Sequence, residues 1–329
     1  MNITLHQLMV FTVIVDKKSV TKAAEELNMT QPAVSIQLKN LQDQFEIPLT
    51  EVIGRKIYIT DFGIELYRIA GRVLQEMDTI RYKASGYKGI LSGKLSISVV
   101  STGKYIMPYF LSGFLNAHPE VDLRMDVTNR SKVRKSLEDN EVDFSLVSVL
   151  PSQMPVMEEI IMPNKWYLLA ARDYPMDGAK DRAATGKAHA PTGKSAPTSR
   201  QRLDKSAFGK IPLIYREEGS GTRYMMQQYF SQANITPKIS LELSSDEAVK
   251  QAVIAGLGCS ILSILTLKNE LKQKEVRIIP IAGLPLKSNW RLIWLKRKKL
   301  SLVAQAYLDY LRQEKASIYK TNFSWIEQY

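Results

Sequence analysis

Short polar segments at the ends of predicted strands are the first candidates for binding chemistry in this sequence. Ser101-Thr102 follows a strand-forming run over 94–100 and precedes a helical run. Thr128-Asn129 and Ser148 follow two further predicted strands, and Gly219-Ser220-Gly221-Thr222-Arg223 makes a glycine-rich turn before another helix. Hydroxyls and free backbone N–H groups at a helix start can receive an anion, and glycine lets the backbone approach a ligand closely.

Arg223 would add a fixed cation to these hydroxyls. The segments together predict a site for a small anionic metabolite, although each Ser, Thr or Asn taken singly is equally consistent with capping of the helix that follows it. The predicted ligand-binding residues are Ser101, Thr102, Thr128, Asn129, Ser148, Ser220, Thr222 and Arg223.

A second group of candidates lies on a helix predicted near the N-terminus. Thr30 is a good N-cap, Pro32 falls in the first turn, and Val34, Leu38 and Leu41 repeat at helical spacing. A rotation of ~100° per residue then turns Pro32, Ser35, Ile36 and Lys39 outward. Ser35 can bond base edges or phosphates, Lys39 can neutralise a phosphate, and Ile36 can contact a thymine methyl group. The alternative is an ordinary solvated helix face.

The elements around this helix favour DNA binding. Amphipathic helices are predicted over 5–15 and 20–27, the second capped by Ser19, and a tight turn joins the second to the helix that begins after Thr30. Residues 49–60 predict a hairpin that turns around Gly54-Arg55-Lys56. Arg55 and Lys56 at its tip would reach phosphates or the minor groove. The arrangement is a helix-turn-helix followed by a basic wing.

A long helix is predicted over 62–88. Its apolar seam has steps of three and four residues, which is typical of a helix that pairs with a second copy, and the alternative is packing against its own domain. The seam consists of Tyr67, Ala70, Leu74, Met77, Arg81 and Ala84.

After a glycine-bounded hinge at 89–93, predicted strands and helices alternate as far as residue 312, which indicates an α/β domain. The run 177–206 contains few bulky apolar residues and predicts a flexible surface insertion.

Composition limits the remaining possibilities. The net charge of +12 favours an anionic partner, but DNA, a membrane surface and a polyanionic ligand would serve equally. One cysteine, Cys259, and three widely separated histidines provide no metal-ligand spacing, so we expect neither a metal nor another cofactor. No apolar run reaches the ~18 residues that span a membrane, and no secretory signal is evident, so we expect a cytoplasmic protein without a membrane partner.

The segment Ser-Val-Thr-Lys-Ala-Ala-Glu-Glu-Leu-Asn-Met-Thr-Gln-Pro-Ala-Val-Ser at 19–35 closely resembles the helix-turn-helix signature of the bacterial LysR-type transcriptional regulators. The resemblance continues through the wing at 54–60 and nearly to residue 312. Four segments resemble the CbbR-type regulators of RuBisCO and Calvin-cycle operons: Ser101–Tyr105, Asn129-Arg130, Gly219–Arg223 and Ser244–Val253.

This resemblance implies an α plus α/β fold. A winged helix-turn-helix over 1–61 would be followed by a linker and dimerisation helix over 62–88 and by a periplasmic-binding-protein-like (type 2) α/β effector domain over 89–315. Subdomain I would comprise about 92–163 and 268–315, subdomain II about 164–267, and a C-terminal tail 316–329. The candidate loops would then surround one cleft between the subdomains. The resemblance also adds Gln31 to Pro32 and Ser35 as a DNA contact.

Three departures from the family pattern are visible. In the DNA-binding module, Ile36 replaces a basic residue of many relatives and Leu49-Thr50-Glu51-Val52 replaces Leu-Phe-Glu-Arg. Thr60-Asp61-Phe62-Gly63 replaces Thr-Pro-x-Gly, and the family usually lacks an insertion as long as 177–206. Asp61 is then a candidate cap of the linker helix. With fewer basic residues, the module would depend more on Lys39, Arg55 and Lys56 for phosphate contacts.

The sequence therefore predicts a sequence-specific DNA-binding transcriptional regulator that responds to an anionic metabolite. The resemblance implies that it acts as a homodimer assembling to a homotetramer, with RNA polymerase as a further partner. The alternative is a solute-binding receptor that uses the same cleft, which the first 88 residues oppose. No nucleophile–base pairing or metal spacing suggests an enzyme, so we predict no catalytic residue.

Overall fold

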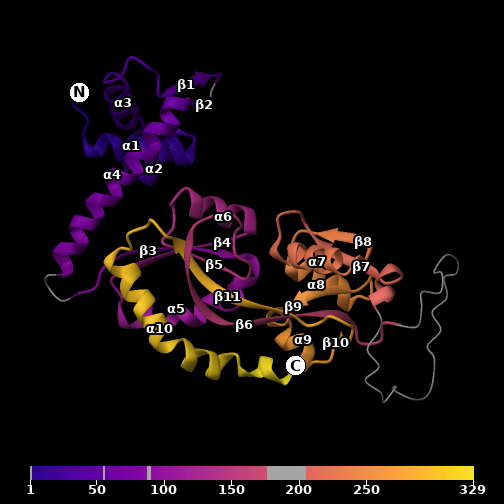
Figure 1. Ribbon diagram of the computed structural model, residues 1–329. Helices are drawn as coiled ribbons and strands as arrows, with labels where there is room; N and C mark the ends of the chain where they lie inside the picture. The colour runs from indigo at the N-terminus through magenta and orange to yellow at the C-terminus, as the bar shows by residue number, and fades with distance from the viewer. Residues whose placement is uncertain (1, 55, 87–89, 176–204) are drawn as a thin grey trace. The chain divides into compact units, whose positions relative to one another are not determined.

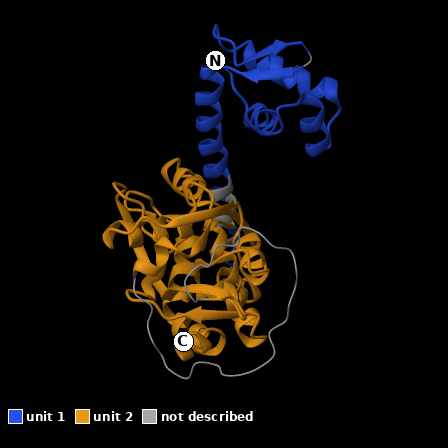
Figure 2. Cartoon of the chain, turned by 90° about the vertical axis from the view of Figure 1, so that its right-hand side faces the viewer, with its two compact units in different colours: residues 1–93 blue, residues 94–329 orange. Residues whose placement is uncertain are grey.

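The computed structural model describes residues 2–54, 56–86, 90–175 and 205–329. The chain divides into two compact units, residues 1–93 and 94–329 (Figure 2). Arg55 and almost all of the predicted insertion 177–206 lie outside the described residues.

The first unit contains a three-helix module, a hairpin and a long helix (Figure 1). Ser19 and Thr30 cap their helices as predicted, since their side-chain oxygens accept hydrogen bonds from the backbone N–H groups of Lys22 and Ala33. The elements are α1 (Leu5–Lys17), α2 (Val20–Glu26), α3 (Gln31–Gln42), β1 (Thr50–Ile53), β2 (Lys56–Ile59) and α4 (Asp61–Gly86).

The start of α4 differs from the prediction. The Thr60 hydroxyl accepts a hydrogen bond from the Gly63 N–H at 3.0 Å, so Thr60 caps the helix, and Asp61 is its first residue rather than its cap. A Cβ atom at position 63 would lie 2.2 Å from the carbonyl oxygen of Leu49. Only glycine allows the helix start to approach the wing this closely.

The seam of α4 is also different in part. Ala70 is fully buried in a cluster with Leu8 of α1, and the Tyr67 hydroxyl donates to Asp16 at 2.6 Å. The first half of the predicted seam therefore covers the core of its own module. A second row of apolar side chains on α4, which shares Met77 with the predicted seam, remains exposed at steps of four, four and three residues: Ile69, Val73, Met77 and Ile80.

In the second unit, seven of the described strands form one sheet in the order β10-β6-β11-β5-β3-β4, with β9 pairing to β6, and β7 and β8 form a separate parallel pair. The strands are β3 (Gly93–Val100), β4 (Val121–Thr128), β5 (Phe144–Val147), β6 (Val156–Ala171), β7 (Pro212–Arg216), β8 (Lys238–Leu243), β9 (Ser260–Ser263), β10 (Val276–Ile279) and β11 (Leu286–Leu295). The helices are α5 (Met107–Ala117), α6 (Arg130–Glu138), α7 (Gly221–Gln232), α8 (Asp246–Ile254), α9 (Lys268–Lys272) and α10 (Leu302–Asn322). Short 3₁₀ turns are η1 (Ser101–Tyr105), η2 (Lys205–Gly209), η3 (Ile264–Leu267) and η4 (Ser324–Gln328).

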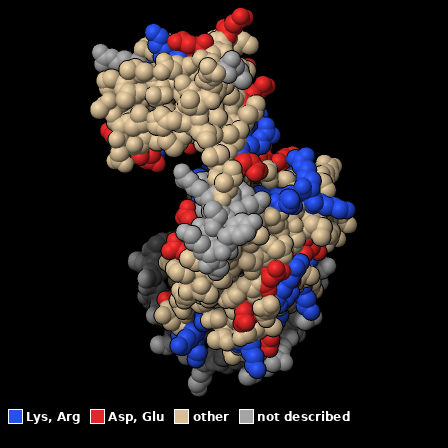
Figure 3. Space-filling model, turned by 90° about the vertical axis from the view of Figure 1, so that its left-hand side faces the viewer, with Lys and Arg blue, Asp and Glu red and all other residues tan. Residues whose placement is uncertain are grey.

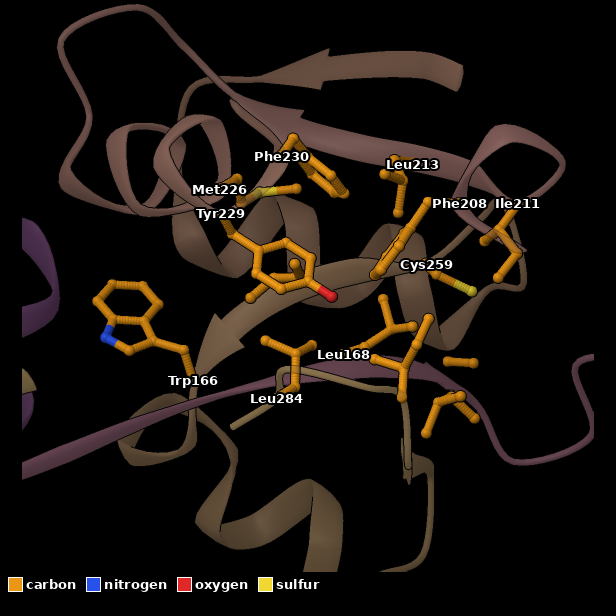
Figure 4. Packing of buried hydrophobic residues seen from close by; sticks show 14 of the residues in the cluster. Trp166, Leu168, Phe208, Ile211, Leu213, Met226, Tyr229, Phe230, Cys259 and Leu284 are labelled. Atoms are coloured by element: carbon orange, nitrogen blue, oxygen red, sulfur yellow. The ribbon is translucent and has the colours of Figure 1, made fainter. Parts of the chain in front are cut away.

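Two lobes make up this unit (Figure 1). The first lobe contains β3–β5, α5 and α6, and the second contains β7–β9, α7 and α8. The long strands β6 and β11 belong to both, because β11 pairs with β5 in the first lobe, while β6 pairs with β9 and β10 in the second. The second lobe has its own core, in which Phe208, Tyr229 and Phe230 pack edge to face beside Cys259 (Figure 4).

Three elements are longer than predicted. The apolar runs 166–171 and 290–295 predict short strands, but the strands that contain them, β6 and β11, begin earlier, at Val156 and Leu286. Helix α10 ends at Asn322 rather than near residue 312, so residues 316–322 of the expected tail are helical. Among the described residues, no helix is long and apolar enough to cross a membrane.

Candidate functional site

The outward face of α3 has the predicted orientation. Val34 and Leu41 are fully buried, whereas Pro32 and Lys39 are exposed. Ile36 is also exposed, with 56% of its surface accessible to solvent. The Gln31 side-chain amide donates to the Ser35 hydroxyl at 2.8 Å, which fixes both polar groups at the N-terminal end of this face. The contacts of these residues with DNA remain a prediction.

The wing exposes apolar as well as basic side chains. Lys56 is exposed as expected, but Val52 and Ile53 on the same hairpin are also largely exposed. Residues 1–61 carry no excess of Lys and Arg over Asp and Glu, so the net charge of +12 arises elsewhere in the chain. Figure 3 shows few charged side chains on the drawn face of this unit, and basic and acidic groups side by side on the second.

Hydroxyls of the two lobes meet at one buried carboxylate. Asp246, the first residue of α8, accepts hydrogen bonds from Thr102 Oγ1 at 2.9 Å and Ser101 Oγ at 3.5 Å, both in η1 of the first lobe. On the second lobe, Thr222 Oγ1 at the start of α7 lies 3.3 Å from the same carboxylate. Three of the predicted ligand-binding hydroxyls are thus brought together, as expected for residues at strand ends that face one cleft.

The cation in this cluster is Arg216, which is not among the residues predicted from the sequence. Its guanidinium is buried and donates to Asp246 and, through Nε and Nη2, to Glu217 at 2.7 and 2.9 Å. Burial disfavours its charged form, but the hydrogen bonds and charges of Glu217 and Asp246 outweigh this, so the pKa of Arg216 is raised. A sequence signal was available, because Arg216 directly follows the apolar run 211–215 that predicts a strand and lies three residues before the glycine-rich turn.

Arg223 has other partners. Its guanidinium donates to the carbonyl of Arg216 at 2.9 Å and to Glu242 at 2.5 Å, and its ring contact is with Tyr215. The side chains of Ser220 and Asn129 cap α7 and α6, the alternative role that a single Ser or Asn before a helix allows. Ser148, which is buried, and Thr128, which is half-buried, form no side-chain hydrogen bond within the described parts of the chain, so their hydroxyls are available to a ligand.

Further contacts join the lobes around this cluster. The Tyr105 hydroxyl donates to Glu247, whose carboxylate also pairs with buried Lys250 at 2.8 Å. The Arg130 guanidinium lies 4.3 Å from the centre of the Tyr224 ring. A Cβ atom at Gly219 would come within 2.8 Å of Ser131 Oγ, so the glycine-rich turn closely approaches α6. The structure therefore describes a closed arrangement of the two lobes.

The single thiol lies away from this cluster. Cys259 is fully buried in the core of the second lobe, where burial raises its pKa to about 12. Within the described ranges, no group of three or more His, Cys, Asp or Glu side chains is placed to hold a metal ion.

Both units of the chain match models of known protein families. The model of the bacterial regulatory helix-turn-helix proteins of the lysR family matches residues 5–64, and that of the LysR substrate binding domain matches residues 88–316. The HTH-type transcriptional activator CmpR of Synechocystis is 35% identical, over 94% of this chain and 95% of its own. The RuBisCO operon transcriptional regulator of Allochromatium vinosum is 34% identical, over 97% and 99% of the two chains.

A solved structure resembles the second unit. The regulatory domain of CcmR from Synechocystis, in complex with 2-PG, is 31% identical, with a TM-score of 0.59 over 68% of this chain and 98% of its own. Together with the CmpR and RuBisCO-operon relatives, this confirms the resemblance to CbbR-type regulators.

Proposed function

Because this chain belongs to the LysR family of transcriptional regulators, we propose that it binds its operator through α3 and the wing and senses a phosphorylated or carboxylated metabolite between the lobes of its second unit. The observation that carries the effector proposal is the convergence of Ser101, Thr102, Thr222 and Arg216 on one anionic group. Hydroxyl donors and a guanidinium are the groups that recognise phosphate and carboxylate in proteins.

The relatives support the class of effector. The CcmR regulatory domain was solved with 2-PG, 2-phosphoglycolate, which carries both a phosphate and a carboxylate. We propose that an effector of this kind contacts Thr102, Thr222 and Arg216, with Ser148 and Thr128 supplying further donors. The relatives are named transcriptional regulators, and we propose that this chain likewise catalyses no reaction and needs no cofactor beyond the effector.

For DNA binding, we propose that Gln31, Pro32, Ser35 and Ile36 face the major groove, while Lys39, Arg55 and Lys56 contact phosphates. The exposure of Ile36 on the outward face of α3 leaves its side chain able to contact a thymine methyl group in the groove. The complex would contain double-stranded DNA at a two-fold related promoter site.

We further propose that two chains pair through α4. The exposed row Ile69, Val73, Met77 and Ile80 supports this pairing, since such a stripe is buried when a second helix packs along it. Two dimers would associate into a cytoplasmic homotetramer that acts on RNA polymerase, and effector binding would change the angle between the DNA-binding pairs.

A binding experiment on matched variants tests the effector proposal. In Thr102→Val, which preserves shape but removes the hydroxyl, we expect the Kd for 2-phosphoglycolate to rise about tenfold or more, the loss associated with a hydrogen bond to a charged group. Affinity for the operator duplex should not change. Thr266→Val is the control, because the hydroxyl of this buried threonine donates to the Ser263 carbonyl at 2.9 Å and not to Asp246.

Two results would count against the proposal. One is equal binding of 2-phosphoglycolate by wild type and Thr102→Val in a thermal-shift or calorimetric titration. The other is binding to operator DNA no tighter than to random duplex at the same salt concentration, which would remove the claim of sequence-specific recognition.

A further inference from the structure

Asp246 already occupies the place where the proposed effector's anionic group is expected. Its side chain is buried, and its two oxygens accept from Thr102 and Ser101 on one lobe and from Thr222 and Arg216 on the other. All four donors belong to segments outside α8. An internal carboxylate therefore satisfies the donor set that a phosphate or carboxylate ligand would need.

Most of these donors are already engaged. Three of the five N–H groups of Arg216 are used, one by Asp246 and two by Glu217, and each threonine hydroxyl has a single proton to donate. A negatively charged ligand brought to the same donors would also face the charge of Asp246 at close range. Binding there requires the Asp246 carboxylate to leave.

We propose that Asp246 is a tethered competitor of the effector, which holds the two lobes together in the ligand-free protein and is displaced by the effector's anionic group. The inference rests on the proposed function of this cleft. It makes Asp246 a specificity-determining residue, because a ligand succeeds only if it offers these donors more charge and more acceptor oxygens than one carboxylate does. A phosphate meets that requirement and a lone monocarboxylate does not.

The displaced carboxylate has a favourable alternative position. Asp246 is the first residue of α8, where the partial positive charge of the helix N-terminus stabilises a carboxylate as its side chain rotates. The neighbouring residues Ser244 and Ser245 are exposed, so rotation towards them returns the charge to water.

The direct test compares Asp246→Asn with wild type in the full-length chain. The amide keeps the size of the side chain but removes the competing charge, and we expect the Kd for 2-phosphoglycolate to fall about tenfold or more, as it does when a ligand no longer competes with a state populated at about 90%. Glu218→Gln is the matched control, because it removes the same charge from an exposed residue two positions after Arg216. We expect this control to change the Kd less than about threefold.

A second variant tests whether a ligand carboxylate can occupy the place of the Asp246 side chain. In Asp246→Ala, formate should fill the vacated place beside Arg216, raising the melting temperature in a saturable manner that wild type does not show. Formate should also raise the apparent Kd of this variant for 2-phosphoglycolate by simple competition. This readout holds even if the amide of Asp246→Asn distorts the cluster.

The outcomes separate this inference from the proposed function. If wild type binds 2-phosphoglycolate and Thr102→Val weakens it, but Asp246→Asn binds no more tightly and formate does not compete, Asp246 is a structural counter-ion and the inference is overturned while the proposed function stands. If neither wild type nor Asp246→Asn binds 2-phosphoglycolate or inorganic phosphate, the proposed function and the inference fail together.

Discussion

Replacing Ile36 by alanine tests the assignment of α3 as the helix that reads DNA. Full burial of an isoleucine side chain is worth ~1.5–3 kcal/mol, and Ile36 is 56% exposed in the free protein. A contact with a thymine methyl group can therefore contribute roughly 1 kcal/mol per module. In a dimer that presents two modules, the loss is about 2 kcal/mol, or about a 30-fold rise in Kd.

The variant should fold normally, because Ile36 lies outside the core and alanine has the higher helix propensity. Weaker DNA binding would then not reflect unfolding. Ile47→Ala is a matched control, since Ile47 is 55% exposed, belongs to the same unit and lies beyond the end of α3. Fluorescence anisotropy with operator and random duplexes at one salt concentration measures the difference.

We expect Ile36→Ala to lower affinity for the operator and to leave affinity for random duplex unchanged, while Ile47→Ala changes neither. The reasoning is refuted if both variants lose the same affinity. It is also refuted if Ile36→Ala loses as much on random duplex as on the operator, because a base contact would not produce that pattern.

Three further predictions follow from charges and burial. Ile36→Lys should steepen the slope of log K against log salt concentration by ~0.9 per module and strengthen binding to random duplex; an unchanged slope would place residue 36 away from phosphates. With its pKa at about 12, Cys259 should react with a thiol reagent at pH 8 roughly 10³-fold more slowly in the native protein than in denaturant, and rapid native labelling would contradict its burial. Burial opposes ionisation of Glu159, but Lys315 and Arg312 outweigh it and lower its pKa below 4.5. Glu159→Gln should therefore lower the melting temperature at pH 7, and its difference from wild type should shrink as the pH falls below about 4.5; a constant difference would exclude the charge as the cause.

The DNA-binding module was largely predictable because its signals are local. Ser19 and Thr30 directly precede the helices that they cap, and the apolar spacing of Val34 and Leu41 is a property of a single helix. The seam of α4 was less predictable, because Ala70 suits a dimer contact as well as it suits the intramolecular hydrophobic cluster to which it belongs. Spacing alone does not reveal which surface covers an apolar stripe.

The kinds of residue that form the candidate site were predictable from the sequence, but the partners of its charged residues were not. Hydroxyls at strand ends pointed to Thr102 and Thr222, yet the pairing of Arg216 with Asp246 joins residues 30 positions apart and depends on how β7 and α8 are placed. Similarly, the residues after 312 on α10 include Lys315, a typical solvated residue in sequence, which pairs with Glu159 of β6. Charged residues report their partners only after the fold has brought them together.

The distribution of charge links the two units functionally. Because residues 1–61 carry no excess of basic residues, one module gains little from sequence-independent attraction to phosphates. Stable occupancy of an operator then depends on base contacts and on simultaneous engagement of two modules, whose effective concentration depends on geometry. If the angle between the two paired modules changes, this protein should therefore lose a larger fraction of its operator affinity than a regulator with strongly basic modules would lose. Displacement of Asp246 by the effector would thus have a large effect on operator binding, because weak non-specific attraction to DNA would not compensate for the lost contacts.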